Sequence, residues 1–346
     1  MSKSHHRGFT TVPGFTLVEM LVVITIIGIL AALLLPAVMI AIRTARNAAI
    51  ALEIKQIDTA VEAYRLEKGD YPPNFRDPNI VRRHITKCYP RIDPQYFTYF
   101  MNKVFPSSGA NAYVAGVSVP VIDESECLVF WLSMTDTDPQ FPFLSFPVTD
   151  ATGTPYPTGV QYDAYNNTTG TGKQASPKRY YDFDQTRLLS SNSADVKSFQ
   201  AKYCGDTFYI YIDSRSYNVF PGGVTPSGTR TDLVQFKQRD GNDTYAIADD
   251  IASGVRPYWT SPPKLTGTLP TGTAFRNITA LKPANQTTFQ IICAGQDGDY
   301  GTDLTIDNDV KIATGALAGT NFNPAGGDKD NITNFSNGKM LNDLIP

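Results

Sequence analysis

The stretch GFTLVEMLVVITIIGILAALLLPAVMIAI, residues 14–42, decides how this chain is organised. No charged residue occurs from Met20 to Ile42. At a rise of about 1.5 Å per residue, a helix of this length crosses a hydrocarbon core of about 30 Å. The sequence therefore predicts a membrane-spanning helix near the amino end, and no second apolar run of spanning length follows it.

One acidic residue, Glu19, lies near the start of this apolar run. Inserting an ionised carboxylate there costs about 2.5–3.5 kcal/mol, so Glu19 either reaches back to the polar interface or finds a partner. A cut between Gly14 and Phe15 would give Phe15 a free α-amine four residues from Glu19. In a helical bundle, this amine could pair with the carboxylate of a neighbouring subunit.

These residues resemble the class III signal of type IV pilins and of type II secretion pseudopilins. The resemblance rests on Gly14, Phe15 and Glu19, followed by the apolar run that contains Pro36. It implies cleavage after Gly14 by a prepilin peptidase and N-methylation of Phe15. It also implies that Glu19 sets the register of subunits during assembly.

Residues 1–14 are interpreted as a leader that is removed. Its cations Lys3 and Arg7 favour a cytoplasmic amino end, with the remainder in the periplasm or outside the cell. Together with the resemblance, this implies a single-pass protein of the inner membrane that enters a filament after assembly. The alternative is an ordinary secretory signal cut at Ala31 or Ala32, although further apolar residues follow both.

The helix is expected to continue beyond the membrane and to cover residues 15–68. Residues 15–42 form its membrane and filament-core segment, and residues 43–68 form an amphipathic half. Apolar residues recur in the second half at helical spacing, namely Ile50, Ile54, Ile57, Val61 and Tyr64. Gly69 and the following Pro72 and Pro73 predict the end of the helix, and Pro36 predicts a kink or a local break within it.

Residues 69–346 are interpreted as a globular head. Its acidic residues are 26 Asp against only Glu124 and Glu126, and Asp favours turns over helices, so we expect mainly strands and loops. Strands are predicted at residues 207–212 and 288–293, and a short buried helix at residues 124–134. The resulting fold class is α+β and pilin-like, with a long helix packed on a mainly antiparallel sheet and an enlarged middle region.

Composition argues against several classes of function. The net charge of −3 gives no basic surface for nucleic acid. Of three histidines, His5 and His6 lie in the leader, and His84 is interpreted as part of a solvated basic patch with Arg82 and Arg83. One histidine is too few for a His-based zinc site, and no nucleophile elbow accompanies it. We therefore predict that the protein is not an enzyme.

Aromatic residues and cysteines of the head have structural interpretations. The aromatic clusters are expected to pack in the core rather than to form a binding surface; they are Tyr96, Phe97, Tyr99, Phe100, Phe141, Phe143 and Phe146. The four cysteines are compatible with three disulfide pairings or with buried free thiols, and the sequence selects none of these; they are Cys88, Cys127, Cys204 and Cys293.

An Asp- and Gly-rich region covers residues 294–334, with AGQDGDYGT at 294–302 and GGDKDNITN at 326–334. Calcium binds about six to eight oxygens on sharply turning backbone, which Asp and Gly supply. The region resembles the carboxyl-terminal calcium loop of major pseudopilins, which implies a calcium site at Asp297, Asp299, Asp328 and Asp330. Asp303, Asp307 and Asp309 are rival ligands, and metal-free Asp–Gly turns are the alternative.

The sequence therefore predicts a structural subunit of a type II secretion or type IV pilus filament. The resemblance implies other pilin or pseudopilin subunits, an inner-membrane platform protein and a cytoplasmic assembly ATPase as partners. The alternative is a binding module, such as a minor subunit at the filament tip, whose large head recognises a secreted substrate, a polysaccharide or DNA.

Overall fold

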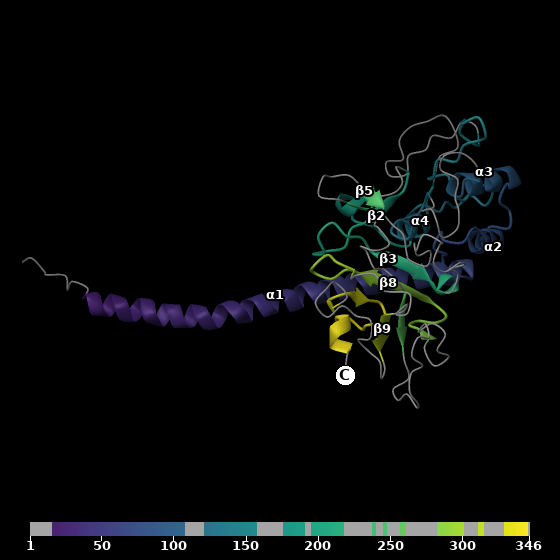
Figure 1. The fold of residues 1–346 in the computed structure, drawn as a ribbon. Coiled ribbons are helices and arrows are strands. Elements are labelled where there is room, and N and C mark those ends of the chain that lie inside the picture. The colour runs from purple at the N-terminus through teal and green to yellow at the C-terminus, as the bar shows by residue number, and fades with distance from the viewer. Residues whose placement is uncertain are drawn as a thin grey trace, which may run out of the picture. The chain divides into compact units, whose positions relative to one another are not determined.

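A computed structural model describes residues 16–107, 121–157, 176–190, 195–217, 237–239, 245–247, 257–260, 282–300, 311–314 and 329–344 (Figure 1). The chain divides into two compact units, Met1–Arg46 and Asn47–Pro346. We call residues 17–46 the anchor segment and Asn47–Pro346 the head unit, and we describe each by itself.

The first helix, α1 (Leu17–Lys68), contains 52 residues and runs without interruption through Pro36. The predicted local break at Pro36 is therefore wrong, because the loss of one amide donor is tolerated while the bonds on either side persist. The helix ends as predicted. Gly69 has a left-handed φ of +76°, and its amide donates to the Arg65 carbonyl at 2.7 Å.

Within the head unit, α1 buries one face. The predicted apolar stripe is confirmed, since all its members are buried; they are Ile50, Ile54, Ile57, Val61 and Tyr64. Each such side chain contributes about 1.5–3 kcal/mol when it is fully buried. This part of α1 is therefore a core helix of the head unit.

The central sheet of the head unit has β8 (Phe289–Cys293) in the middle, antiparallel to β3 (Ile210–Asp213) on one side and to β10 (Ile332–Thr333) on the other. β3 and β8 lie side by side in Figure 1. β8 falls within the predicted segment 288–293, and β3 overlaps the predicted segment 207–212 and extends one residue beyond it. Both consist entirely of buried residues.

Shorter strands complete the head unit. β1 (Leu188–Ser190) pairs antiparallel with β2 (Lys197–Phe199), and β4 (Lys237–Arg239) with β5 (Tyr245–Ile247). β6 (Tyr258–Thr260) is antiparallel to β7 (Lys282–Pro283) and parallel to β9 (Lys311–Thr314). Single 3-10 turns occur at Gln185–Arg187, Ser214–Ser216 and Leu341–Leu344. The predicted α+β class with mainly antiparallel pairing is confirmed.

The middle region contains more helix than predicted. α4 (Cys127–Ser133) lies where a short buried helix was expected, but α2 (Pro78–Cys88) and α3 (Pro94–Val104) were not predicted. Asp77 and Asp93 cap α2 and α3, and in both helices proline occupies the first turn. Proline fits there because that turn leaves its amides unpaired, so these prolines begin helices rather than break them.

Aromatic side chains from these helices form the core, as predicted. Trp131 stacks on Phe75 with ring centroids 5.4 Å apart, and Phe100 stacks on Phe143 at 4.5 Å. The indole nitrogen of Trp131 donates to the Pro73 carbonyl at 2.8 Å. The core thereby holds the turn that follows α1 against α4.

Candidate functional site

The amino-terminal turn of α1 positions Glu19. The amide and the hydroxyl of Thr16 donate to the Glu19 carboxylate at 2.8 and 2.7 Å, and the Thr16 hydroxyl accepts from the Glu19 amide at 3.3 Å. This reciprocal arrangement is a capping box. Its sequence signal is T-x-x-E, which occurs at Thr16–Glu19, but the capping box was not predicted. Glu19 therefore has a local partner within its own chain.

The anchor segment behind Glu19 is apolar and exposed. Leu17, Leu33 and Ile40 keep 81%, 70% and 66% of their surface accessible. Among the described residues, one helix is long and apolar enough to cross a membrane, and it is α1. A helix that is apolar on every side requires lipid or other helices around it.

The Asp–Gly region follows β8 and brings two of the four predicted ligands together. Asp330 Oδ2 accepts hydrogen bonds from the amides of Gln296 and Asp297 at 2.7 and 3.1 Å. Gly295 has a φ of +71°, and a Cβ there would lie 2.5 Å from Asp330 Cγ. Only glycine fits this close approach of the backbone to a carboxylate.

The remaining oxygen of Asp330, Oδ1, is buried and accepts no hydrogen bond from the described part of the chain. Burial raises the pKa of Asp297 to about 6, and the nearby carboxylates of Asp330 and Asp299 raise it as well. Two carboxylates that face each other this way repel unless a proton or a cation lies between them. The donor set therefore suits a hard cation bound by oxygen.

Of the other predicted ligands, Asp299 is exposed, as Asp297 also is, and its amide donates to Asp297 Oδ1 at 2.9 Å. Asp328 and the rivals Asp303, Asp307 and Asp309 lie outside the described residues. No group of three or more metal-ligating His, Cys, Asp or Glu residues comes together in the described ranges.

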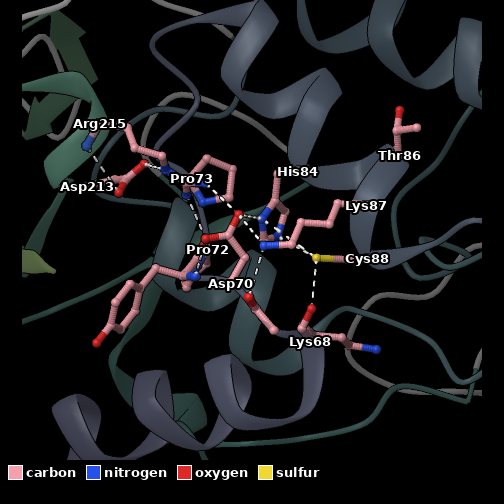
Figure 2. A network of polar contacts seen from close by, with 12 residues as sticks. Lys68, Asp70, Pro72, Pro73, His84, Thr86, Lys87, Cys88, Asp213 and Arg215 are labelled. Carbon is pink, nitrogen blue, oxygen red and sulfur yellow. Dashed lines mark hydrogen bonds and ion pairs between the residues drawn. The ribbon is translucent and has the colours of Figure 1, made fainter. Parts of the chain in front are cut away.

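His84 in α2 belongs to a buried polar network and not to the surface (Figure 2). The prediction of a solvated patch is wrong for this residue, because it falls on the buried face of the helix, whereas Arg82 and Arg83 are exposed. Its Nε2 lies 3.0 Å from Tyr64 Oη, and its Nδ1 lies 3.6 Å from Asp70 Oδ2.

Asp70 connects this network to β3. Arg215 donates through Nη1 to Asp70 at 2.8 Å and through Nε to Asp213 at 2.6 Å. Burial opposes ionisation of Asp70, but the hydrogen bond with His84 and the charge of Arg215 hold its pKa well below its usual range. Burial lowers the pKa of His84, which favours the neutral ring at neutral pH. The network ties the end of α1 to α2 and β3.

Cys88 approaches the same histidine, with its Sγ 3.7 Å from the His84 ring nitrogens. Burial raises the pKa of the Cys88 thiol to about 11. Since the thiolate is the reactive form, this sulfur is a poor nucleophile at neutral pH. The three side chains in contact, Asp70, His84 and Cys88, therefore have a structural role and do not constitute a cysteine-hydrolase triad.

A cavity of about 410 Å³ opens next to Cys88. Charged side chains of both signs line it, namely Glu67, Lys68, Arg91, Asp136, Asp138 and Lys178. Its size is within the range of small-ligand sites, but such sites are mostly apolar. The mixed charges indicate no single class of ligand.

Comparison with known proteins identifies the amino-terminal segment. Residues 13–35 match the family model of the prokaryotic N-terminal methylation motif, which confirms the resemblance seen at Gly14, Phe15 and Glu19. Gly14 and Phe15 themselves lie outside the described residues. Over 59 residues the chain is 44% identical to the type II secretion system core protein G of Pseudomonas aeruginosa, and this alignment covers 17% of this chain and 42% of that protein. No solved structure matches the chain.

Proposed function

We propose that this chain, which carries an N-terminal methylation motif on an exposed apolar helix, is a structural pilin-like subunit of a type II secretion or type IV pilus filament. One observation carries the proposal. The motif at residues 13–35 places a single carboxylate, Glu19, at the start of a helix long enough to span a membrane. Similarity to a type II secretion core protein supports the same class.

In this proposal, a prepilin peptidase cuts after Gly14 and Phe15 is N-methylated. The cations Lys3 and Arg7 hold the amino end in the cytoplasm, and the head unit faces the periplasm or the exterior. The subunit waits in the inner membrane until a platform protein and a cytoplasmic assembly ATPase move it into the filament. It binds no nucleotide itself and acts as a structural component, not as an enzyme.

Glu19 changes partner during assembly. In the single subunit, the uncharged donors of Thr16 satisfy its carboxylate at 2.7 and 2.8 Å. Burial in the filament core would cost several kcal/mol for an unpaired charge, and the α-amine of Phe15 on a neighbouring subunit would offset this cost. The pairing is therefore favoured only where a processed neighbour is present.

Two substitutions separate capping from pairing. Glu19→Gln keeps the side-chain oxygen that a capping box requires but removes the charge, whereas Glu19→Ala removes both. We expect both variants to reach the membrane fraction at normal levels and to be lost from sheared filaments. Normal incorporation of Glu19→Gln would contradict the pairing, because the variant can cap the helix but cannot neutralise an amine.

Processing is tested by mass spectrometry of the mature amino terminus. The proposal expects N-methyl-phenylalanine derived from Phe15 as the first residue. A chain that begins at Met1 or downstream of the apolar run would overturn the proposal. Gly14→Ala should block the cut and leave the leader attached, while Gly28→Ala, a change within the apolar run, should be processed normally.

We also propose that the Asp–Gly region binds calcium, with Asp297 and Asp330 as ligands and Asp299 and Asp328 as further candidates. The support is the buried, unpartnered Oδ1 of Asp330 beside a carboxylate whose pKa is raised to about 6. Backbone carbonyls and water would supply the remaining oxygens.

Calcium is tested by melting the purified full-length protein with and without the ion. Binding raises the melting temperature by mass action. We expect a calcium-dependent increase that Asp330→Asn abolishes and that Asp182→Asn, at a carboxylate with 89% of its side chain exposed, preserves. An equal response to calcium in both variants would contradict the site.

The alternative function is a scarce tip subunit whose enlarged head binds a secreted substrate, a polysaccharide or DNA. The cavity next to Cys88 is the observation that favours it. Copy number in sheared filaments separates the two functions, since a major subunit is abundant along the fibre and a tip adaptor is rare.

A further inference from the structure

Cys204 and Cys293 bring their sulfur atoms to within 3.1 Å across 89 residues of chain. Cys293 is the last residue of β8, the central strand of the head unit, and both side chains are buried. A disulfide bond is about 2.0 Å long, so a shift of about 1 Å in one sulfur would close it.

The backbone around Cys204 is bent in an unusual way that directs it to this position. The residues on either side, Tyr203 and Gly205, have left-handed φ values of 60° and 64°. A bulky residue such as tyrosine rarely adopts this conformation and needs surrounding structure to hold it. The Thr207 hydroxyl contributes by donating to the Cys204 carbonyl at 2.7 Å.

The other two cysteines have different surroundings. Cys127 Sγ donates to the Glu124 carbonyl at 3.3 Å, inside the first turn of α4. Cys88 Sγ donates to the Lys68 carbonyl at 3.4 Å, beside the buried histidine of α2. Cys204 Sγ also donates to a local carbonyl, that of Lys202 at 3.0 Å. What distinguishes Cys204 and Cys293 among the described cysteines is the second sulfur in contact with each of them.

We propose that Cys204 and Cys293 form a disulfide in the exported protein, while Cys88 and Cys127 remain thiols. This rests on the proposed export of the head unit, because disulfides persist in oxidising compartments. Both S–H bonds break and one S–S bond forms; the two electrons and two protons released reduce the disulfide of a thiol-oxidising protein, whose S–S bond breaks, to a dithiol.

The position of this bond gives it a role in the Asp–Gly region. The Cys204 carbonyl lies 3.1 Å from where a Cβ on Gly298 would be, so the Cys204 turn packs directly against the loop that follows β8. A disulfide would attach this turn to the end of β8. The loop that carries Asp297 would then be fixed by β8, which it follows, and by the Cys204 turn, which packs against it.

The test is peptide mapping of the full-length protein from membranes, with thiols alkylated under denaturing conditions before digestion. We expect a cross-linked pair of peptides containing Cys204 and Cys293, lighter by two hydrogen atoms than the two thiol peptides together. Cys88 and Cys127 should be alkylated without reductant. Reductant should lower the melting temperature by roughly 4–15 °C. Cys204→Ser/Cys293→Ser should not respond to reductant, and the matched control Cys88→Ser should respond as wild type does.

Alkylation of both Cys204 and Cys293 without reductant would overturn the disulfide. If that protein begins at methylated Phe15, export is correct and only the pairing fails. If it begins at Met1, the proposed function fails, and the pairing is then judged by incubation with oxidised glutathione. The cross-link should form under that treatment, and its absence would overturn the pairing independently.

Discussion

Glu19 and Glu53 lie on the same helix in opposite surroundings. Glu19 is exposed, and among the described residues its carboxylate is bound by Thr16, at the start of its own turn. Glu53 is 4% exposed, receives two hydrogen bonds from Arg187 at 2.6 and 2.7 Å, and accepts a third from the Tyr209 hydroxyl at 2.6 Å. A carboxylate fully satisfied inside its own fold supports stability, whereas one held by its own first turn could exchange that contact for the amine of the proposed neighbouring subunit.

The apolar residues of α1 differ in the same way. Ile27 in the anchor segment is 59% exposed, while Ile57 in the head unit is completely buried. One continuous helix thus has two hydrophobic patterns, an apolar surface on every side and a single stripe. The apolar surface of the anchor segment needs lipid or other helices around it. The apolar stripe is already buried within the head unit.

The largest effect is expected from Glu53→Ala. It leaves the half-buried guanidinium of Arg187 and the buried hydroxyl of Tyr209 without the carboxylate that they contact, which costs about 3–5 kcal/mol of folding free energy. Denaturant unfolding of the detergent-solubilised protein, followed through the buried Trp131, measures the loss. Glu19→Ala is the control and should leave this transition unchanged; equal losses in the two variants would remove the distinction between the two carboxylates.

Ile57→Ala should cost about 2–5 kcal/mol in the same measurement, because it opens a cavity in the core of the head unit. Ile27→Ala removes the same atoms from the anchor segment and should not move the transition. If Ile27→Ala destabilised the head unit to a similar extent, the anchor segment would have to be packed on it.

Removing the caps of α1 and α2 should have smaller effects, which again differ between the anchor segment and the head unit. Asp77 accepts a hydrogen bond from the Asn79 amide at 2.7 Å at the start of α2. Asp77→Ala should cost the head unit about 0.5–2 kcal/mol. Thr16→Ala removes the cap of α1 and should loosen only the first turn of the anchor segment, which amide hydrogen exchange near Glu19 would detect. A shift of the head transition by Thr16→Ala would contradict this locality.

The smallest effect concerns pH. The pKa of Asp70 is lowered in the folded head unit, so its contribution is present above its ordinary value of 3.8 and is lost as the pH falls through the folded value. Its charged neighbours are Lys87 and Arg215, and it also faces the ring of His84. The stability difference between wild type and Asp70→Asn should therefore shrink in acid. An unchanged difference from neutral pH to well below 3.8 would show that Asp70 is not ionised in this network.

Sequence patterns predicted the elements whose signal repeats over many residues. The spacing from Ile50 to Tyr64 located the buried face of α1, and the β-branched and aromatic runs located β3 and β8. Long, regular patterns succeed because a single misplaced residue does not change the face that they bury.

The predictions failed at residues whose sequence pattern is compatible with two different local structures. Helices α2 and α3 were not predicted, although Asp77 and Asp93, each followed by proline, are a cap and a first helical residue. His84 next to two arginines suggested a surface, although helical spacing turns it inward to Tyr64. Thr16 was read as part of a signal and also forms the cap. The tertiary packing around each residue decides which of the two local structures forms.

The Asp–Gly loop also contacts α1 at the residue where the head unit begins. Gln296, beside Asp297, donates through its side-chain nitrogen to Asn47 Oδ1 at 2.5 Å. Asn47 is the first residue of α1 that belongs to the head unit. A change in the loop would therefore reach the part of α1 inside the head unit directly, through this hydrogen bond.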